Sequence, residues 1–565
     1  MRVPLAAWLR RSVVAGFGLS LALGTTLTSW ADTPVEQTVP DSTIVFVKIK
    51  NVADLRQALK QTNLGQMFQD EAVKPALESV FTRMDTANSS VKESLGLTIR
   101  EILDLPQGTV SISVMAQDDA KRPVAAYITA DAGKNDSKMA ELMAKLTKLA
   151  EEKGGKVTTD TFQSLTLTTV VTPNPQGGEG EASQMPLTWV RKDTTYHIAS
   201  SPEVLKEILT KGATREDSLS KSEQFAKVAS KVGGDSQGVM YIDITQLVKL
   251  VSKTADAQGG NAQQVEAMLQ ILGVNNVKAF GGSINFAKDS FDTVTKGYLY
   301  TPGPPQGLLR LFQMPRVELR PEAWVPAAIA SYQTLSWDLD AFYEGLNDLV
   351  NMFQPGSLAA IEQQLVGPEG GEPIKFQRDI FGPLGDRVSV ITDVKPGGGP
   401  NSQKMLFAVA LEDAKAFQNT LNKILAIANI QPKKREFQGN TIYDVEINLP
   451  EGGPANPLSG PLSMTISKES LFVSTDAAML EQVLRGGGQS LADSTAFQSL
   501  VKELPEKSSS LNYSRSDQSA RATYEMLKSG DFQQALDAAA VNGRPAPKVK
   551  ELVDLDKLPD FSVFA

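Results

Sequence analysis

The sequence predicts an α+β protein made of two similar repeats, each a mostly antiparallel sheet covered by helices. Apolar stretches of strand length lead into amphipathic stretches of helical length, and this series occurs twice in the same order. Segments rich in glycine and proline separate the blocks, as is typical of connections between elements. The 565 residues include no cysteine, so each repeat must be stabilised by its core and not by disulfides.

A strand and a helix open each repeat. Residues 39–47 and 325–332 both begin with Val-Pro and continue as apolar strands. Each strand leads into a helical stretch, which covers residues 51–68 in the first repeat and 338–353 in the second.

The next blocks also occur in pairs. Residues 100–114 and 378–392 each combine a short helix, a turn with proline or glycine, and an alternating strand. Residues 123–131 then match 405–413, and both runs lead into an amphipathic helix.

Three later blocks complete the series. They pair Phe162 with Phe437, residues 186–209 with 461–484, and residues 219–225 with 491–497. Six blocks in one order indicate an internal duplication. The alignment predicts that Val45 superimposes on Ser331 and Val110 on Val388.

The first repeat contains a smaller module twice. Residues 238–251 resemble the opening strand and helix that begin at Val39. Residues 269–300 resemble the region around 93–130, with a Leu-Gly pair followed by two strands. The sequence therefore predicts that the first repeat ends on a copy of its own beginning.

The first 31 residues have the pattern of a signal peptide. Three arginines precede the apolar run 12–24, whose 13 residues are fewer than the roughly 18–20 that span a bilayer. Small residues lead up to a predicted cleavage between Ala31 and Asp32. We therefore expect an exported protein, periplasmic or extracellular. An uncleaved segment that anchors the chain to the inner membrane is the alternative.

The Pro/Gly-rich run 301–305 sets the predicted domain limits. The first repeat then covers residues 32–302 and the second covers 303–565. The second repeat reaches the apolar run 561–564 where the first has a full hairpin at 274–300. This difference predicts that the given chain lacks a final strand or two.

The charge of the chain argues against nucleic-acid binding. The formal net charge is −9 and becomes about −12 once the three arginines of residues 1–31 are removed. An acidic surface without a dense basic cluster repels phosphate backbones. Apart from residues 1–31, the sequence has no uncharged apolar run long enough to predict a transmembrane helix.

The sequence lacks the residue sets of common catalytic centres. Its single histidine, His197, aligns with Phe472 of the second repeat, which favours a packing or surface role. Ser283 lies in a Gly-Gly-Ser run that precedes a hairpin, whereas a nucleophile elbow precedes a helix. No phosphate-binding or dinucleotide-binding glycine pattern occurs. We therefore expect a non-enzyme without cofactors.

Two acidic clusters raise the question of calcium. Asp340, Glu344 and Asp348 fall on one ridge of a predicted helix, close to Asp338, so they cannot surround an ion. The aspartates within 554–560 lack the glycine and the distal glutamate of an EF-hand. We expect both clusters to be solvated, and we expect no metal.

The start of the chain resembles a family of exported bacterial proteins that is described as a domain of unknown function. A Val-Pro-x-x-Thr strand leads into a helix that carries a Thr-x-Leu-Gly pattern. Its matching residues are Thr43, Leu55, Thr62, Leu64 and Gly65. The resemblance covers about the first 130 residues and implies no activity, because the family has no assigned catalytic residues.

These observations favour a non-catalytic cell-envelope protein that binds another protein or a surface polymer. A carrier of an apolar ligand such as a lipid is one alternative, because Met- and Leu-rich helices over a sheet can enclose a pocket. A carboxylate-dependent hydrolase is another, since 65 acidic residues offer many pairs. The oligomeric state is not predicted.

Overall fold

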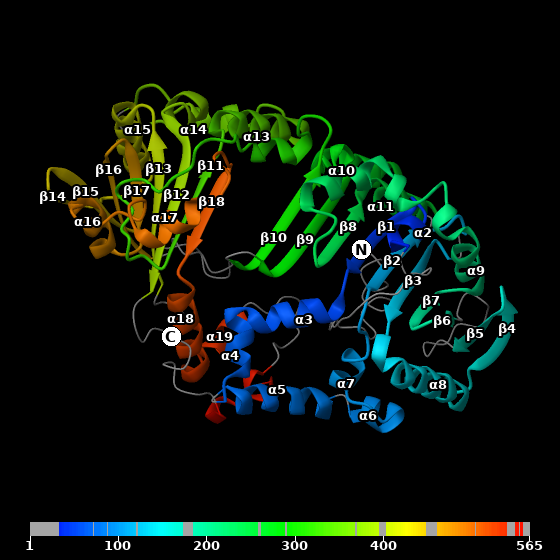
Figure 1. Ribbon diagram of the computed structural model, residues 1–565. Coiled ribbons are helices and arrows are strands. Elements are labelled where there is room, and N and C mark those ends of the chain that lie inside the picture. Colours follow the sequence, from blue (N-terminus) through cyan, green and yellow to red (C-terminus); the bar gives the residue numbers. More distant parts are fainter. Residues whose placement is uncertain are drawn as a thin grey trace. The chain divides into compact units, whose positions relative to one another are not determined.

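The computed structural model describes the chain from Thr33 to Lys557 and shows two compact units (Figure 1). Within this range the description leaves out residues 72, 88, 120–121, 173–184, 258–261, 289–290, 368–369, 395–402, 448–459, 503, 539–547 and 553. Unit 1 comprises the described parts of Met1–Leu269, Asn275–Pro304 and Lys550–Pro559. Unit 2 comprises the described parts of Gln270–Val274, Pro305–Val549 and Asp560–Ala565. Residues 1–31 and the predicted cleavage between Ala31 and Asp32 lie outside the described residues.

Unit 1 contains a ten-stranded antiparallel sheet with the order β10-β9-β8-β1-β2-β3-β7-β6-β5-β4. The strands are β1 (Thr43–Ile49), β2 (Val110–Ala116), β3 (Val124–Asp131), β4 (Lys156–Phe162), β5 (Leu165–Thr172), β6 (Met185–Lys192), β7 (Thr195–Ala199), β8 (Gly238–Asp243), β9 (Ala279–Lys288) and β10 (Phe291–Tyr300). The helices in this part of the chain are α2 (Val35–Thr38), α3 (Val52–Gln61), α4 (Asn63–Gln69), α5 (Lys74–Ala87), α6 (Ser89–Leu95), α7 (Ile99–Leu103), α8 (Asp136–Glu152), α9 (Pro202–Lys211), α10 (Glu223–Val232), α11 (Ile244–Ala257) and α12 (Ala262–Leu272).

Unit 2 contains an eight-stranded antiparallel sheet with the order β14-β15-β16-β17-β13-β12-β11-β18. The strands are β11 (Ser331–Ser336), β12 (Leu384–Val394), β13 (Gln403–Leu411), β14 (Lys433–Phe437), β15 (Asn440–Ile447), β16 (Gly460–Ser467), β17 (Ser470–Ser474) and β18 (Ser510–Ser514). The helices are α13 (Leu339–Phe353), α14 (Ser357–Gln364), α15 (Ala414–Ile427), α16 (Ala477–Arg485), α17 (Thr495–Val501), α18 (Ser516–Ser529) and α19 (Asp531–Ala538). The predicted fold class, α+β with two helix-covered antiparallel sheets, is confirmed.

The two sheets share one strand order. Reading the sheet of unit 2 from β18 gives β18-β11-β12-β13-β17-β16-β15-β14, which follows β8-β1-β2-β3-β7-β6-β5-β4 of unit 1 strand by strand. The register agrees as well, because Ile49 lies opposite Val110 and Leu335 lies opposite Val388. Val110 thus corresponds to Val388, and the same register matches Val45 to Ser331. A duplication as the origin of this likeness stays a prediction.

One pair of strands follows a different alignment from the predicted one. Val110 lies opposite Ala130 on β3, and its counterpart Val388 lies opposite Val409 on β13. Ala130 therefore corresponds to Val409, three residues before the position that the sequence alignment gave it. That alignment is wrong because it matched the aspartates that end the two runs. A shift by an odd number of residues moves every side chain of a strand to the other face of the sheet. The alignment of β3 with β13 therefore decides which residues of unit 2 correspond to the side chains on each face of β3.

Strands β8, β9 and β10 repeat the arrangement of β1, β2 and β3 within unit 1. Each trio is a series of antiparallel neighbours, and β1 pairs with β8 where the trios meet. This is the arrangement that the smaller repeat predicts. The described residues of unit 2 hold no counterpart of β9 and β10. The place where the sequence predicts one, residues 561–564, lies outside the described residues.

Helices cover both faces of the unit 1 sheet. On one face, α9 and α10 contribute Leu205 and Val228 to a core that includes Phe46 and Tyr127. On the other face, α8 packs over a core that includes Tyr196. Alternation along β1 places Lys48 on the same face as Phe46. The first face is thus apolar beneath its helices and polar farther along β1.

The helical stretch predicted at 51–68 is two helices. Thr62 interrupts it, and its side-chain oxygen accepts a 3.0 Å hydrogen bond from the backbone N–H of Gly65, which caps α4. Gly65 lies so close to α3 that a Cβ there would be 1.8 Å from the carbonyl oxygen of Leu59. Two residues of the pattern noted in the sequence therefore fix a tight helix–helix corner.

The last described segment returns to unit 1. Helix α20 (Val549–Leu552) leads to the 3-10 helix η9 (Leu555–Lys557), which packs against α5. The backbone N–H of Asp554 donates a 3.3 Å hydrogen bond to Ser79 Oγ. The predicted division at residue 302 instead placed this segment in the second repeat. None of the described helices combines the length and the apolar character that spanning a bilayer requires.

Candidate functional site

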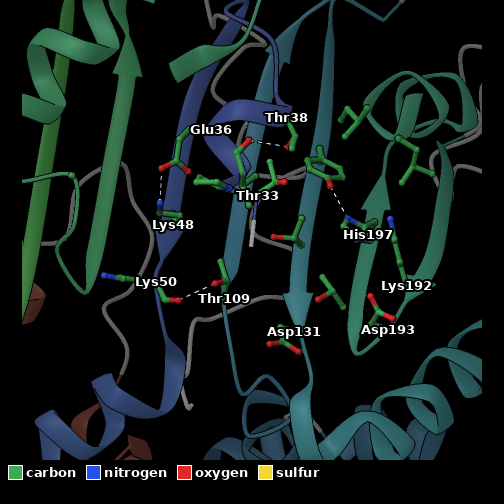
Figure 2. A pocket seen from close by; sticks show the side chains of 18 of the residues that line it. Thr33, Glu36, Thr38, Lys48, Lys50, Thr109, Asp131, Lys192, Asp193 and His197 are labelled. Carbon is green, nitrogen blue, oxygen red and sulfur yellow. Dashed lines mark hydrogen bonds and ion pairs between the residues drawn. The ribbon is translucent and has the colours of Figure 1, made fainter. Parts of the chain in front are cut away.

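A polar pocket of about 500 Å³ opens on the sheet of unit 1 (Figure 2). Strands β1, β3 and β7 contribute its floor, and α2 with the residues just before it contributes a wall. Helix α9, the turn between α10 and β8, Thr109 just before β2, and Lys192 and Asp193 at the end of β6 supply the rest of the lining. The lining residues are Thr33, Pro34, Val35, Glu36, Thr38, Lys48, Lys50, Thr109, Tyr127, Thr129, Asp131, Lys192, Asp193, Thr195, His197, Ile208, Leu209, Gly234 and Asp235.

Threonine hydroxyls are the commonest polar groups in this lining. They belong to Thr33, Thr38, Thr109, Thr129 and Thr195. Thr129 Oγ1 shares a 2.7 Å hydrogen bond with Ser111 Oγ, and Thr109 donates to the carbonyl of Lys50 at 2.9 Å. A hydroxyl can donate one hydrogen bond and accept two, so these side chains retain capacity for a ligand.

The charged side chains of the pocket nearly balance. Four carboxylates and three ammonium groups line it: Glu36, Asp131, Asp193, Asp235, Lys48, Lys50 and Lys192. Lys48 Nζ donates to Glu36 at 2.7 Å, and Lys50 pairs with Asp235 at an exposed edge. The Lys50 ammonium lowers the pKa of the Asp235 carboxyl. Because opposite charges are interspersed, the pocket suits a neutral ligand with many hydrogen-bonding groups better than a strongly charged one.

Tyr127 and His197 form a hydrogen-bonded pair at the back of the pocket. The phenol oxygen of Tyr127 lies 2.7 Å from Nδ1 of His197. Burial and, to a smaller extent, the charge of Lys192 lower the pKa of His197 to about 4. Burial also raises the pKa of Tyr127. Both groups are therefore neutral at pH 7, and an imidazole with such a pKa is a weak general base there.

Glu36 leaves one oxygen without a partner. Its Oε1 accepts the hydrogen bond from Lys48, whereas its Oε2 is buried and has no hydrogen-bond partner among the described residues. A buried acceptor without a donor costs on the order of 1–3 kcal/mol, and more when it is charged. A ligand that carries a hydroxyl or an N–H can supply the missing donor.

Unit 2 fills the corresponding place with apolar side chains. Trp324 takes the position of Thr38, and Phe472 takes the position of His197. Their rings lie 5.1 Å apart in an edge-to-face contact, and Phe472 is fully buried. The fold by itself therefore does not leave this space open. The smaller and more polar side chains of unit 1 open it.

Both units carry a glutamate three residues before a Val-Pro pair, Glu36 in unit 1 and Glu322 in unit 2. Both carboxylate oxygens of Glu322 have partners. Oε1 accepts from Ser389 at 2.5 Å and pairs with Arg387 at 3.0 Å, and Oε2 accepts from Tyr332 at 2.8 Å. Unit 2 thus satisfies the carboxylate with its own side chains, and unit 1 does not.

The structure also places the other residues that the sequence analysis weighed. Ser283 lies on β9, where its hydroxyl donates to the carbonyl of Val232 at 2.5 Å. Asp338 caps α13, and Asp348 pairs with Arg310 at 2.7 Å. The described residues hold no group of three or more acidic or histidine side chains arranged to bind a metal. That the protein needs neither metal nor cofactor stays a prediction.

Sequence reasoning located His197 but missed the pocket around it. It started the repeat alignment at Val39 and so passed over Glu36, although the Glu-x-x-Val-Pro pattern recurs at Glu322. It also read 39–47 as a plain strand, although Lys48 and Lys50 follow Phe46 at alternate positions. A search for aligned positions that are polar in the first repeat and apolar in the second would have indicated the site.

Comparisons with known proteins agree with the resemblance seen in the sequence. A search of curated proteins found no match. One solved structure, titled "Structure of crystal form I of TP0453", is similar with 8% identity over 80% of this chain and 97% of that chain. Its TM-score of 0.18 is too low to support an argument about fold or function. Residues 22–290, which include the whole pocket, match the family described as "Protein of unknown function (DUF3352)".

Proposed function

We propose that the protein is a non-catalytic binding protein of the cell envelope, and that the pocket of unit 1 holds a hydroxyl-rich group such as a sugar unit of a surface polymer. The location rests on the signal-peptide pattern of residues 1–31. The observation that carries the ligand class is the convergence of five threonine hydroxyls with balanced charges in a pocket that unit 2 fills.

A sugar fits this lining chemically. Each sugar hydroxyl both donates and accepts, and carboxylates and ammonium groups form the stronger, charge-assisted hydrogen bonds with it. The floor is a sheet, so the polar groups are held in place before a ligand arrives, which lowers the entropy cost of binding. No serine lines the described pocket, and its histidine is a weak base at neutral pH. These features favour binding over catalysis.

The test is saturation-transfer NMR with methyl glycosides of glucose, galactose, mannose and N-acetylglucosamine. We expect transfer to at least one of them. Thr38→Trp, which introduces the residue that unit 2 has at this position, should abolish the transfer. Thr159→Val, on an exposed position of β4, should leave it unchanged. Transfer to none of the four glycosides, or equal transfer with Thr38→Trp in a folded protein, would overturn the proposal.

A further inference from the structure

A second, apolar cavity of about 200 Å³ lies beneath α10 in unit 1. Three aromatic rings line it: the ring of Phe225 packs edge-to-face against Phe46 at 5.9 Å and against Tyr241 at 5.1 Å. The other apolar lining residues are Val228, Ala229, Val232, Val239 and Met240. Groups of this kind offer hydrocarbon contact and almost no hydrogen bonds, so the cavity suits an alkyl or acyl chain.

The apolar cavity and the polar pocket adjoin one another. Glu36 and Gly234 line both of them. The unpartnered oxygen of Glu36 therefore belongs to a side chain that stands where a polar lining meets an apolar one.

Gly234 keeps this junction open. Its φ lies outside the left-handed region, so its backbone does not require glycine. A Cβ at this position would instead lie 3.5 Å from Cβ of Ala229 on α10. Any longer side chain would occupy the space that the two cavities share.

We infer that the ligand is amphipathic, a sugar that carries a short alkyl or acyl chain. The sugar occupies the polar pocket, the chain occupies the apolar cavity, and a hydroxyl or amide N–H between them donates to Glu36 Oε2. This inference rests on the proposed sugar binding and deepens it. It names a glycolipid, and not a free polysaccharide, as the class of ligand.

The experiment is calorimetry with a chain-length series of methyl, butyl, hexyl and octyl glycosides of each of the four sugars, each below its micelle concentration. Each buried methylene is worth about a fourfold gain in affinity, so we expect at least a tenfold gain from methyl to hexyl in one series. Ala229→Leu fills the apolar cavity and should remove the gain while the methyl glycoside still binds. Ala226→Leu, on the exposed face of the same helix, is the matched control and should keep it.

The outcomes separate the two proposals. Binding of a methyl glycoside without any gain along the series contradicts the amphipathic ligand and leaves sugar binding intact. A gain that persists unchanged in Ala229→Leu also contradicts it. If Ala229→Leu fails to fold, Ala229→Val provides the same test with a smaller change. Absence of binding by every glycoside in all four series contradicts the proposed function itself.

Discussion

Tyr127 and His197 are joined by a 2.7 Å hydrogen bond between the neighbouring strands β3 and β7. Unit 2 has Leu406 and Phe472 at the same two places, and both are fully buried. The two sheets match in strand order, but at these two positions unit 1 has a polar pair and unit 2 has an apolar pair. Exchanges of this kind make the lining of the pocket in unit 1 polar.

The first prediction concerns the titration of His197. Because burial disfavours the imidazolium, its pKa should be about 4, compared with about 6.5 for an exposed histidine. It is the only histidine of the chain, so its NMR signals are unambiguous. A titration of the imidazole carbon resonances checks this value. A midpoint near 6.5 would show that the ring is solvated.

The same shift predicts how stability depends on pH. The folded pKa lies below the unfolded one, so the contribution is complete above about pH 6.5 and is lost as the pH falls from 6.5 to 4. The loss should approach about 3 kcal/mol, because the unfolded chain binds the proton first. Urea unfolding at several pH values measures it. The double variant Tyr127→Leu with His197→Phe, which copies unit 2, should lose this part of the pH dependence; an unchanged slope between pH 4 and 6.5 would contradict the prediction.

The third prediction concerns Gly108 and its neighbour Asp131, which lines the pocket. A Cβ on Gly108 would be 1.9 Å from Oδ2 of Asp131, whose Oδ1 is held by the N–H of Gly133 at 2.9 Å. In unit 2 the acidic residue and the small residue have exchanged places: Asp386 corresponds to Gly108, and Ala410 corresponds to Asp131. Gly108→Ala should therefore cost about 1–3 kcal/mol of stability in the wild type.

A double-mutant cycle tests that explanation. In an Asp131→Ala background the clash is absent, so Gly108→Ala should cost much less, with a coupling of about 1 kcal/mol or more. Denaturant unfolding of the four proteins gives the coupling energy. Equal costs of Gly108→Ala in both backgrounds would mean that the destabilisation has another cause.

The fourth prediction concerns the corner between α3 and α4. Thr62→Ala removes the oxygen that caps α4 and should lower stability by about 1 kcal/mol, whereas Thr62→Ser keeps the oxygen and should cost less. Thermal unfolding of the two variants compares them directly. Equal destabilisation by Ala and Ser would indicate that the methyl group of Thr62, and not its hydroxyl, matters at this corner.

The fold was largely predictable from the sequence, because hydrophobic period and turn residues report the type of element locally. The matching of Val110 to Val388 followed from such patterns, and it agrees with the strand pairing. The alignment of β3 with β13 was wrong because short apolar strands without an internal polar marker admit more than one register.

The pocket could not be predicted in the same way. Its residues lie far apart in the sequence, from Glu36 to Asp235, and only the strand order brings them together. Nor does the local sequence reveal that Thr38 lines a cavity, because its counterpart Trp324 occupies the same backbone position beside a filled core. Information of this kind depends on which side chains meet across the sheet.

The most direct test of the account uses His197 as a reporter inside the pocket. With carbon-13 in its imidazole, the resonance should shift on addition of the methyl glycoside that binds, and the shift should saturate with the same Kd as calorimetry gives. Thr38→Trp should abolish both. Binding by calorimetry that leaves the His197 resonance unchanged would place the ligand elsewhere and contradict the assignment of this pocket as the binding site.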